Sequence, residues 1–344
     1  MPETNKQTIT DKITSFVLKN NKETSVQISN LGACITKFCI KNANNQLVDV
    51  VLAYDNLDDY CDNPYYLGVT VGPYANRIAK GRFNIDGVLY QLAINNGPNN
   101  LHSGATGIHN KIWTLKEHTS NSVLFSLLCP HLEDGFPGNV QLGIKFELNN
   151  NNELCINYSA LSDKKTIVNL TNHAYFNLNG HNAGTCTQHL VKINAHYYTP
   201  IASDGIPTGE ILPVKNTPFD FTRNKTIQAD IDVQNQQLTN GNGYDHNFVV
   251  DNYDGSLQCV AQAIGDKSNI SLEVFSTLPG LQFYVGSYLD IAQGGKNNAS
   301  YPARSGFCFE TQHLPNSVNQ PNFPSTIIEA GKQYNFTTVY KLSS

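Results

Sequence analysis

The sequence predicts an all-β fold, in the form of a large antiparallel β-sandwich, and three observations support this prediction. Apolar residues alternate with polar residues over many short runs, as in strands that bury one face. Clusters of Gly, Pro and Asn separate those runs. No long segment keeps the 3.6-residue period of an amphipathic helix. Many short strands with such punctuation are typical of sandwiches.

The clearest strand signals lie at two places. Residues 140–148 and 154–160 each alternate strictly between apolar and other residues, and an asparagine-rich turn separates them. This pattern predicts a pair of antiparallel strands. Asp86 and Gly87 stand between two alternating runs within 82–90, which is a strong signal for a hairpin with a two-residue turn.

The other elements are expected along the whole chain. Apolar runs within 24–53, broken near Asn42, predict a hairpin-like pair of strands. Residues 230–238 predict at most a short helix. Further strands are predicted over residues 123–128, 189–194, 246–251, 257–264, 270–277, 281–286, 306–312 and 334–341.

Long loops connect these strands, at residues 54–80, 95–111, 178–188 and 287–305. Long ordered loops on a rigid sheet usually build a functional site. No Pro/Ser-rich linker, repeat or block of charge divides the chain. We therefore predict one domain that spans residues 1–344.

Composition narrows the class of protein. The 344-residue chain has a net charge of −5 and only 15% charged residues. It therefore lacks the excess of basic residues that nucleic-acid-binding proteins usually have. Its N-terminal segment has no apolar core, and no run is long enough to span a bilayer. We expect a soluble cytoplasmic protein, a monomer or homodimer, that does not bind a membrane. The eight scattered cysteines contain no CxxC pair, and we interpret them as mostly buried free thiols.

The stretch 171–180 is the first candidate for a functional site. It follows a strand-like run, and if the strand continued, alternation would place His173 and Tyr175 on one face. Asn169, Thr171 and Asn177 would share that face. Such a row of hydrogen-bonding groups suits a groove for a polyhydroxylated ligand. The alternative is a solvated strand face with a histidine of no function.

Glu310 is the second candidate. It ends an apolar strand, next to Phe309 and two residues after Cys308. Glutamate is rarely buried without a partner or a task, and burial would raise its pKa toward that of a general base. The alternative is a structural glutamate that pairs with an arginine such as Arg304.

Other candidates lie in turns and at strand ends. Arg77 could clamp hydroxyl groups through its forked donors, although base rates favour the alternative of a surface arginine. His102 lies in a turn-rich loop, where histidines without function are common. Asp245 precedes a strand and could accept two sugar hydroxyls or form an Asx turn. Gln282, which would share a face with Tyr284, offers both a donor and an acceptor.

Standard catalytic and metal-binding motifs are absent from the sequence: it contains no HExxH, GxSxG, P-loop, GxGxxG or zinc-type Cys/His spacing. Six other motifs occur together and in order between residues 72 and 322, and with them the chain resembles the aldose 1-epimerase (galactose mutarotase) family. They are Asn76-Arg77-Ile-Ala-Lys-Gly, Asn-Asn-Leu-His102, Thr-Asn-His173-Ala-Tyr-Phe-Asn-Leu, Gly-Tyr-Asp245-His-Asn, Pro-Gly-Leu-Gln282-Phe-Tyr and Phe-Glu310-Thr-Gln-His-Leu-Pro-Asn. The sequence departs from the residues usual in that family at Ser103, at 107–111 and at Asn316, and these departures bear on substrate preference.

The resemblance implies a β-sandwich with an open sugar cleft that interconverts the α and β anomers of free hexoses such as galactose and glucose. It implies no metal and no cofactor. By this resemblance Glu310 is the general base and His173 the general acid. The implied substrate-binding residues are Asn76, Arg77, His102, Tyr175, Asp245 and Gln282. Two alternatives stay open: a hexose-6-phosphate 1-epimerase, which would need additional Arg or Lys, and a non-catalytic carbohydrate-binding sandwich.

The chemistry of ring opening fits these residues. One group must remove a proton from the C1 hydroxyl, and another must deliver a proton to the ring oxygen. We expect desolvation to raise the pKa of Glu310 and a neighbouring carboxylate to raise that of His173. Glu310 would then govern the acid limb of the pH–rate profile, and His173 the alkaline limb.

Overall fold

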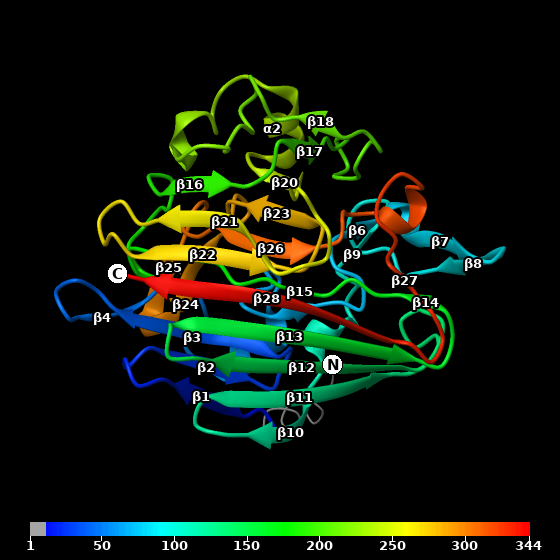
Figure 1. Ribbon diagram of the computed structural model, residues 1–344, viewed down its shortest axis with the longest axis horizontal. Helices are drawn as coiled ribbons and strands as arrows, with labels where there is room; N and C mark the ends of the chain where they lie inside the picture. Colours follow the sequence, from blue (N-terminus) through cyan, green and yellow to red (C-terminus); the bar gives the residue numbers. More distant parts are fainter. Residues whose placement is uncertain (1–11) are drawn as a thin grey trace.

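The computed structural model of the chain describes residues 12–344, which are dominated by strands (Figure 1). Within this range the largest element is a nine-stranded, wholly antiparallel sheet. Its strands, in spatial order, are β10 (Thr114–His118), β11 (Ser122–Cys129), β12 (Val140–Leu148), β13 (Glu153–Ser162), β28 (Gln333–Ser343), β22 (Ser271–Ser276), β21 (Gln258–Ile264), β16 (Leu190–Ile193) and β19 (Lys225–Thr226). The predicted all-β antiparallel fold is confirmed. The first eleven residues of the predicted domain and N-terminal segment lie outside the described residues.

The described residues form two further sheets, of four and five strands. The first contains β1 (Ser15–Lys19), β2 (Ser25–Ser29), β3 (Cys34–Lys41) and β4 (Leu47–Asp49). The second has the order β18 (Leu212–Pro213), β17 (Tyr197–Thr199), β20 (Asp245–Val249), β23 (Gly280–Tyr284) and β26 (Cys308–Gln312). Figure 1 shows the red strand β28 across the middle of the large sheet, between β13 and β22.

The main core lies between these layers. Alternate residues of β12, from Val140 to Leu148, are buried, and the residues between them are exposed or half-buried. They pack in one apolar cluster with Phe283 of β23 and Phe309 of β26. The strict alternation read from the sequence is therefore the pattern of a sheet with one face in the core.

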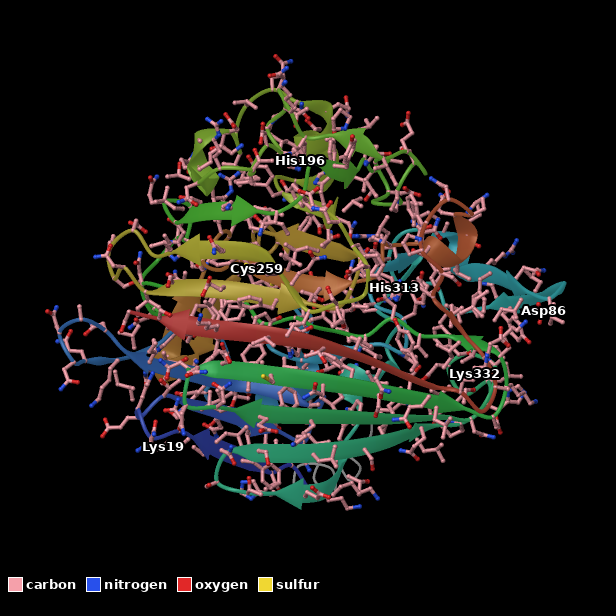
Figure 2. All side chains as sticks on the ribbon, viewed as in Figure 1. Lys19, Asp86, His196, Cys259, His313 and Lys332 are labelled. Atoms are coloured by element: carbon pink, nitrogen blue, oxygen red, sulfur yellow. The ribbon has the colours of Figure 1, made fainter. Side chains whose placement is uncertain are left out.

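Short pairs of strands complete the described fold. They are β5 (Thr70–Val71) with β15 (Thr171–Asn172), β6 (Arg77–Ile78) with β9 (Asn100–Leu101), β7 (Arg82–Ile85) with β8 (Val88–Gln91), β14 (Thr166–Ile167) with β27 (Ile327–Ile328), and β24 (Ile291–Gly295) with β25 (Ala299–Tyr301). The β7–β8 hairpin has its turn at Asp86 and Gly87, as predicted. Figure 2 shows Asp86 at the outer tip of this hairpin.

Helices are few and short in residues 12–344. The α-helix α2 (Gln236–Gly241) begins after Asn235, whose side chain caps it by accepting from the backbone N–H groups of Gln237 and Leu238. It overlaps only the end of the predicted segment 230–238, because this cap fixes a later start. The 3₁₀ turns are η1 (Leu57–Asp62), η2 (Ala79–Gly81), η3 (Ile108–Asn110), η4 (Ile227–Ala229), η5 (Lys296–Asn298) and η6 (Ser317–Asn319). In the described range, no helix has both the length and the apolar character that crossing a membrane requires.

The stretch 171–180 differs from its prediction. The strand ends at Asn172, whose side-chain oxygen accepts from the N–H of Ala174 and turns the chain there. Beyond this turn the backbone of Phe176 pairs with Phe307. Residues 171–178 are all buried, and of the five residues predicted to share a polar face only His173 and Tyr175 line the cleft described below.

Candidate active site

A cleft of about 430 Å³ opens over one face of the second sheet, where strands β20, β23 and β26 meet the long loops. Its lining includes seven of the eight residues singled out from the sequence: Asn76, Arg77, His102, His173, Tyr175, Asp245 and Glu310. These residues come from separate segments of the chain, the first and last of them far apart in the sequence. The eighth, Gln282, does not belong to the described lining.

Strand register places the carboxylates of the cleft together. In the second sheet Gln282 pairs with Asn247 on one side and with Glu310 on the other, so these side chains share a face. Asp245 pairs with Tyr284 and lies two residues from Asn247, on that same face. Asp245 and Glu310 therefore reach the site from the same face of the sheet.

His173 and Glu310 form the chemical centre of the cleft. The Nε2 atom of His173 lies 3.8 Å from Oε1 of Glu310, and the two side chains are 6% and 3% exposed. Within the described residues, Oε2 of Glu310 is buried and has no hydrogen-bond partner. Arg304 pairs instead with Asp232 at 2.8 Å, so the structural pairing considered for Glu310 is not formed. A buried carboxylate oxygen without a partner can accept a ligand hydroxyl.

Burial sets the protonation of this pair. It raises the pKa of Glu310 well above its ordinary value; the Asp245 carboxylate adds to the rise and Arg77 opposes it. Burial also lowers the pKa of His173 to about 4, although a hydrogen bond to its own backbone works the other way. The predicted rise for Glu310 is supported, whereas the predicted rise for His173 is wrong, because desolvation lowers its pKa and His109 acts in the same direction. Burial thus favours a neutral carboxyl beside a neutral imidazole.

His102 is fixed as a hydrogen-bond donor toward the cleft. Its Nδ1 accepts the backbone N–H of Asn76 at 3.1 Å, so the neutral ring carries its proton on Nε2. Burial holds the pKa of His102 well below its ordinary value. The cleft also has a geometry that could suit a metal ion. His102, His173 and Glu310 each offer one ligand atom, and these three atoms lie within 4.8 Å of one another. The tautomer of His102 disfavours that use, because a metal would have to displace the Nε2 proton.

Arg77 and Asp245 form the polar wall beside this pair. NH1 of Arg77 lies 3.9 Å from Oδ2 of Asp245, and the two side chains are largely buried. Nε2 of Gln282 donates to Oδ1 of Asp245 at 2.6 Å. Gln282 is thus placed to orient Asp245, whereas the sequence indicated a residue that contacts the sugar itself.

Aromatic rings surround the imidazoles. The ring of Tyr175 lies 5.0 Å from that of His173, and its hydroxyl donates to the backbone carbonyl of Tyr65. Tyr66, at a positive φ of 57°, lies 4.7 Å from the ring of His102. Sequence reasoning missed Tyr66 because it lies in the middle of the long loop 54–80, where no periodic pattern distinguishes one tyrosine from the next.

Three further lining segments were missed for the same reason: Asn96 in one loop, the turn Ser203–Gly205 in another, and Tyr288 at the exposed rim. Each lies outside a strand, and each approaches the cleft only through the tertiary fold. For Asn96 and Tyr288 the available signal was the length of the loops that contain them, whereas the turn 203–205 lies in none of the four long loops predicted from the sequence.

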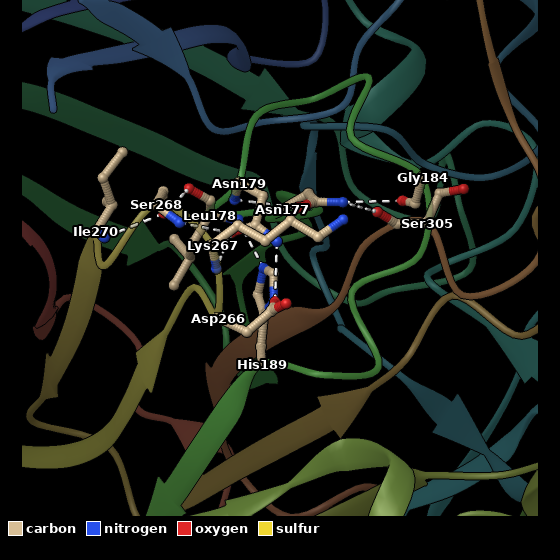
Figure 3. Close-up of polar contacts among 10 residues, drawn as sticks. All are labelled: Asn177, Leu178, Asn179, Gly184, His189, Asp266, Lys267, Ser268, Ile270 and Ser305. Atoms are coloured by element: carbon tan, nitrogen blue, oxygen red, sulfur yellow. Dashed lines mark hydrogen bonds and ion pairs between the residues drawn. The ribbon is translucent and has the colours of Figure 1, made fainter. Parts of the chain in front are cut away.

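A polar network with Asn177 and His189 buried at its centre holds the chain just after His173 (Figure 3). Nδ2 of Asn177 donates to two backbone carbonyls of neighbouring loops, each at 2.9 Å. His189 accepts the N–H of Leu178 at 2.9 Å, and its other ring nitrogen lies 3.0 Å from Asp266. Nδ2 of Asn179 donates to the same carboxylate. Asn177 therefore supports the segment that carries His173, although alternation had predicted that it would face a groove.

Comparison with known protein families gives a match over nearly the whole described chain. The family model described as aldose 1-epimerase matches residues 14–341. The galactose mutarotase of Sus scrofa is 42% identical over 318 residues, which cover 92% of this chain and 91% of that protein. The aldose 1-epimerase of Haemophilus influenzae is 37% identical over 329 residues, covering 95% and 94%.

Solved structures agree with the sequence matches. The structure of an aldose epimerase homologue from C. elegans has a TM-score of 0.89 and 28% identity, covering 96% of this chain and 99% of that one. A galactose 1-epimerase from Lactobacillus acidophilus has a TM-score of 0.83 and 27% identity, covering 96% and 94%.

Proposed function

The chain belongs to the aldose 1-epimerase family of sugar isomerases, and on that premise we propose that it interconverts the α and β anomers of free hexoses such as galactose and glucose, with Glu310 as general base and His173 as general acid. One observation carries this assignment: a buried carboxylate and a buried imidazole lie 3.8 Å apart in one cleft. The two reacting oxygens of a pyranose are both bonded to C1, so the base and the acid must be close neighbours.

The proposed reaction has two mirrored halves. Glu310 takes the proton of the C1 hydroxyl while His173 protonates the ring oxygen, so the bond between C1 and the ring oxygen breaks and an open-chain aldehyde forms. Rotation about the C1–C2 bond then presents the other face of the carbonyl. Ring closure follows with the roles reversed: His173 takes the proton back from the C5 hydroxyl, and Glu310 returns its proton to the C1 oxygen.

The number of titratable protons that Glu310 and His173 hold together supports this cycle. Ring opening leaves Glu310 protonated and His173 neutral, the same neutral arrangement that burial favours. The ionised arrangement, with the proton on His173, is the one that the cyclic sugar requires. Both arrangements hold one proton in total, so a single proton shift within the site connects them.

The remaining residues of the cleft support binding of a polyhydroxylated substrate. Asp245 and Arg77 offer an acceptor and a fork of donors beside Glu310. His102 offers a fixed donor on Nε2. Tyr175 and Asn76 also line the cleft. This set of donors and acceptors is the complement that sugar hydroxyls require.

Charge in the cleft favours a free hexose over a hexose 6-phosphate. In the described lining, Arg77 is the only Arg or Lys, and Asp245 lies beside it. A phosphate group carries close to two negative charges near neutral pH and would need additional cations. A second candidate, a carbohydrate-binding protein without catalysis, would not need the buried carboxyl of Glu310 beside His173.

Polarimetry on freshly dissolved α-galactose tests the proposal, with galactose 6-phosphate measured alongside. We expect the rotation of galactose to reach equilibrium faster than in buffer alone, with little acceleration for the 6-phosphate. Acceleration of the phosphate alone would indicate the phosphate-specific alternative. Sugar binding without acceleration would indicate the non-catalytic one.

A further inference from the structure

A surface turn packs directly on the arginine of the cleft. In the turn 202–206, Gly205 donates to the carbonyl of Ala202 at 2.9 Å and has a φ of +79°. A Cβ atom at Gly205 would lie 2.7 Å from Nε and 2.8 Å from Cζ of Arg77. Ordinary carbon contacts begin near about 3.5 Å. The backbone of the turn therefore approaches the guanidinium as closely as a residue without a side chain permits.

The turn is itself anchored to the loop on the other side of the arginine. Nδ2 of Asn99, a buried residue, donates to the backbone carbonyl of Asp204 at 3.3 Å and to its carboxylate at 3.2 Å. In the same loop as Asn99, Oδ1 of Asn96 accepts from Nε of Arg77 at 2.9 Å. The two loops thus hold the arginine between them.

These contacts leave few positions for the guanidinium. Asn96 occupies its Nε donor, Gly205 blocks one direction of movement, and Asp245 lies 3.9 Å from NH1. The terminal nitrogens consequently point toward the space in which the sugar would lie, beside Asp245. A long arginine side chain otherwise has many rotamers, and fixing it before binding reduces the entropy that binding must overcome.

We propose that Gly205 is a positioning residue for sugar binding: the turn 202–206 fixes the guanidinium of Arg77, and so sets the affinity of the cleft for its hexose. The inference rests on the proposed function. It extends the binding machinery to a segment of the chain that contributes no proton transfer.

The variant Gly205→Ala tests this role, because its new methyl must displace the guanidinium by roughly 1 Å to reach normal contact. We expect KM for galactose to rise by about 10-fold or more, since misplacement on this scale has large effects on substrate interactions. We expect kcat to change much less, because Glu310 and His173 keep their positions. Polarimetric initial rates over a range of galactose concentrations give both constants.

The chain offers a matched control in Gly87, at the tip of the β7–β8 hairpin (Figure 2, beside Asp86). Its φ is +85°, close to that of Gly205, but a Cβ added there would meet no described heavy atom within 4 Å beyond its chain neighbours. Gly87→Ala therefore carries the same backbone strain without the contact. Through this strain it should lower the unfolding midpoint in urea, and it should leave KM unchanged.

A double-mutant cycle separates positioning from general damage. In an Arg77→Ala background, Gly205→Ala should raise KM no further, because the side chain that it displaces is gone. If Gly205→Ala yields too little folded protein, Asn99→Ala tests the same turn, because it removes both hydrogen bonds to Asp204 and adds no atom beside Arg77. It should also raise KM more than kcat falls.

The outcomes distinguish this inference from the proposed function. A wild-type protein without mutarotase activity would refute the function. An active wild type, with equal KM values for Gly205→Ala and Gly87→Ala, would refute the positioning role alone. Equal effects of Gly205→Ala with and without Arg77 would refute it as well.

Discussion

Gln282 donates a 2.6 Å hydrogen bond to Asp245 from the adjacent strand, and this bond orients a carboxylate of the sugar cleft. Charge-assisted hydrogen bonds of this length are stronger than neutral ones and fix the geometry of the acceptor. Because Gln282 holds this carboxylate in place, the role of Asp245 in sugar binding can be tested by a substitution at Asp245 alone.

Replacing Asp245 by alanine removes the acceptor while the strand pairing of β20 and β23 persists. We expect KM for galactose to rise by about 10-fold or more, since hydrogen bonds to a charged group contribute about 1.5–3 kcal/mol. Circular dichroism should stay that of the wild type. An unchanged KM would remove Asp245 from the binding set.

Glu310→Gln keeps the shape of the side chain and removes the base. The loss in kcat should be at least ~10²-fold, the usual lower contribution of a positioned general base. Polarimetry at saturating galactose measures it. Anomer interconversion at the wild-type rate by this variant would contradict the catalytic assignment.

His173→Asn should lose kcat to a comparable degree, because it removes the acid that protonates the ring oxygen. The double variant with Glu310→Gln should lose less than the product of the two single losses, since the groups act as one unit. Strictly multiplicative losses would indicate that the two residues work independently.

The pH–rate profile should have widely separated limbs. Activity requires the pair to hold one proton. The pair gains a second proton as pH falls through the lowered pKa of His173, about 4, and loses its only proton as pH rises through the raised pKa of Glu310. The limb assignment predicted from the sequence is therefore reversed. Values of kcat/KM, corrected at each pH for uncatalysed mutarotation, should stay level near neutrality; an acid limb near the ordinary histidine pKa of about 6.5 would contradict this account.

Dialysis against a chelator should leave activity intact. His102 presents a protonated nitrogen to the cleft, so the cluster of His102, His173 and Glu310 is a poor ligand set. Polarimetry before and after treatment, with a dialysis control lacking chelator, measures the effect. Activity that is lost and then restored by zinc or manganese would show that these histidines hold a metal.

Most of the strands could be predicted because their signal is local. Alternation in 140–148 reports a buried face directly, and Asp86-Gly87 fixes a turn through backbone conformation alone. The break after Asn172 could not be predicted, because it depends on a side-chain hydrogen bond and on pairing with Phe307, far along the chain.

The site residues that could be predicted from the sequence are those that lie in its recognisable motifs. Glu310 was recognisable because a carboxylate in an apolar strand is unusual. The depressed pKa of His173 was not, since desolvation depends on everything that packs around the ring. The close approach of Gly205 to Arg77 joins a turn to strand β6, which is far from it in the sequence, and no local pattern predicts it.

The place of β28 has a consequence for synthesis. Its residue Val339 pairs with Cys155 on one side and with Phe275 on the other, so residues 333–343 join the two halves of the large sheet. A ribosome makes these residues after every other strand of that sheet. Until they emerge, β13 and β22 each present an unpaired edge that can bind another chain. The nascent protein thus has two unpaired edges at the future centre of the large sheet, and that sheet can close only after residues 333–343 have been made.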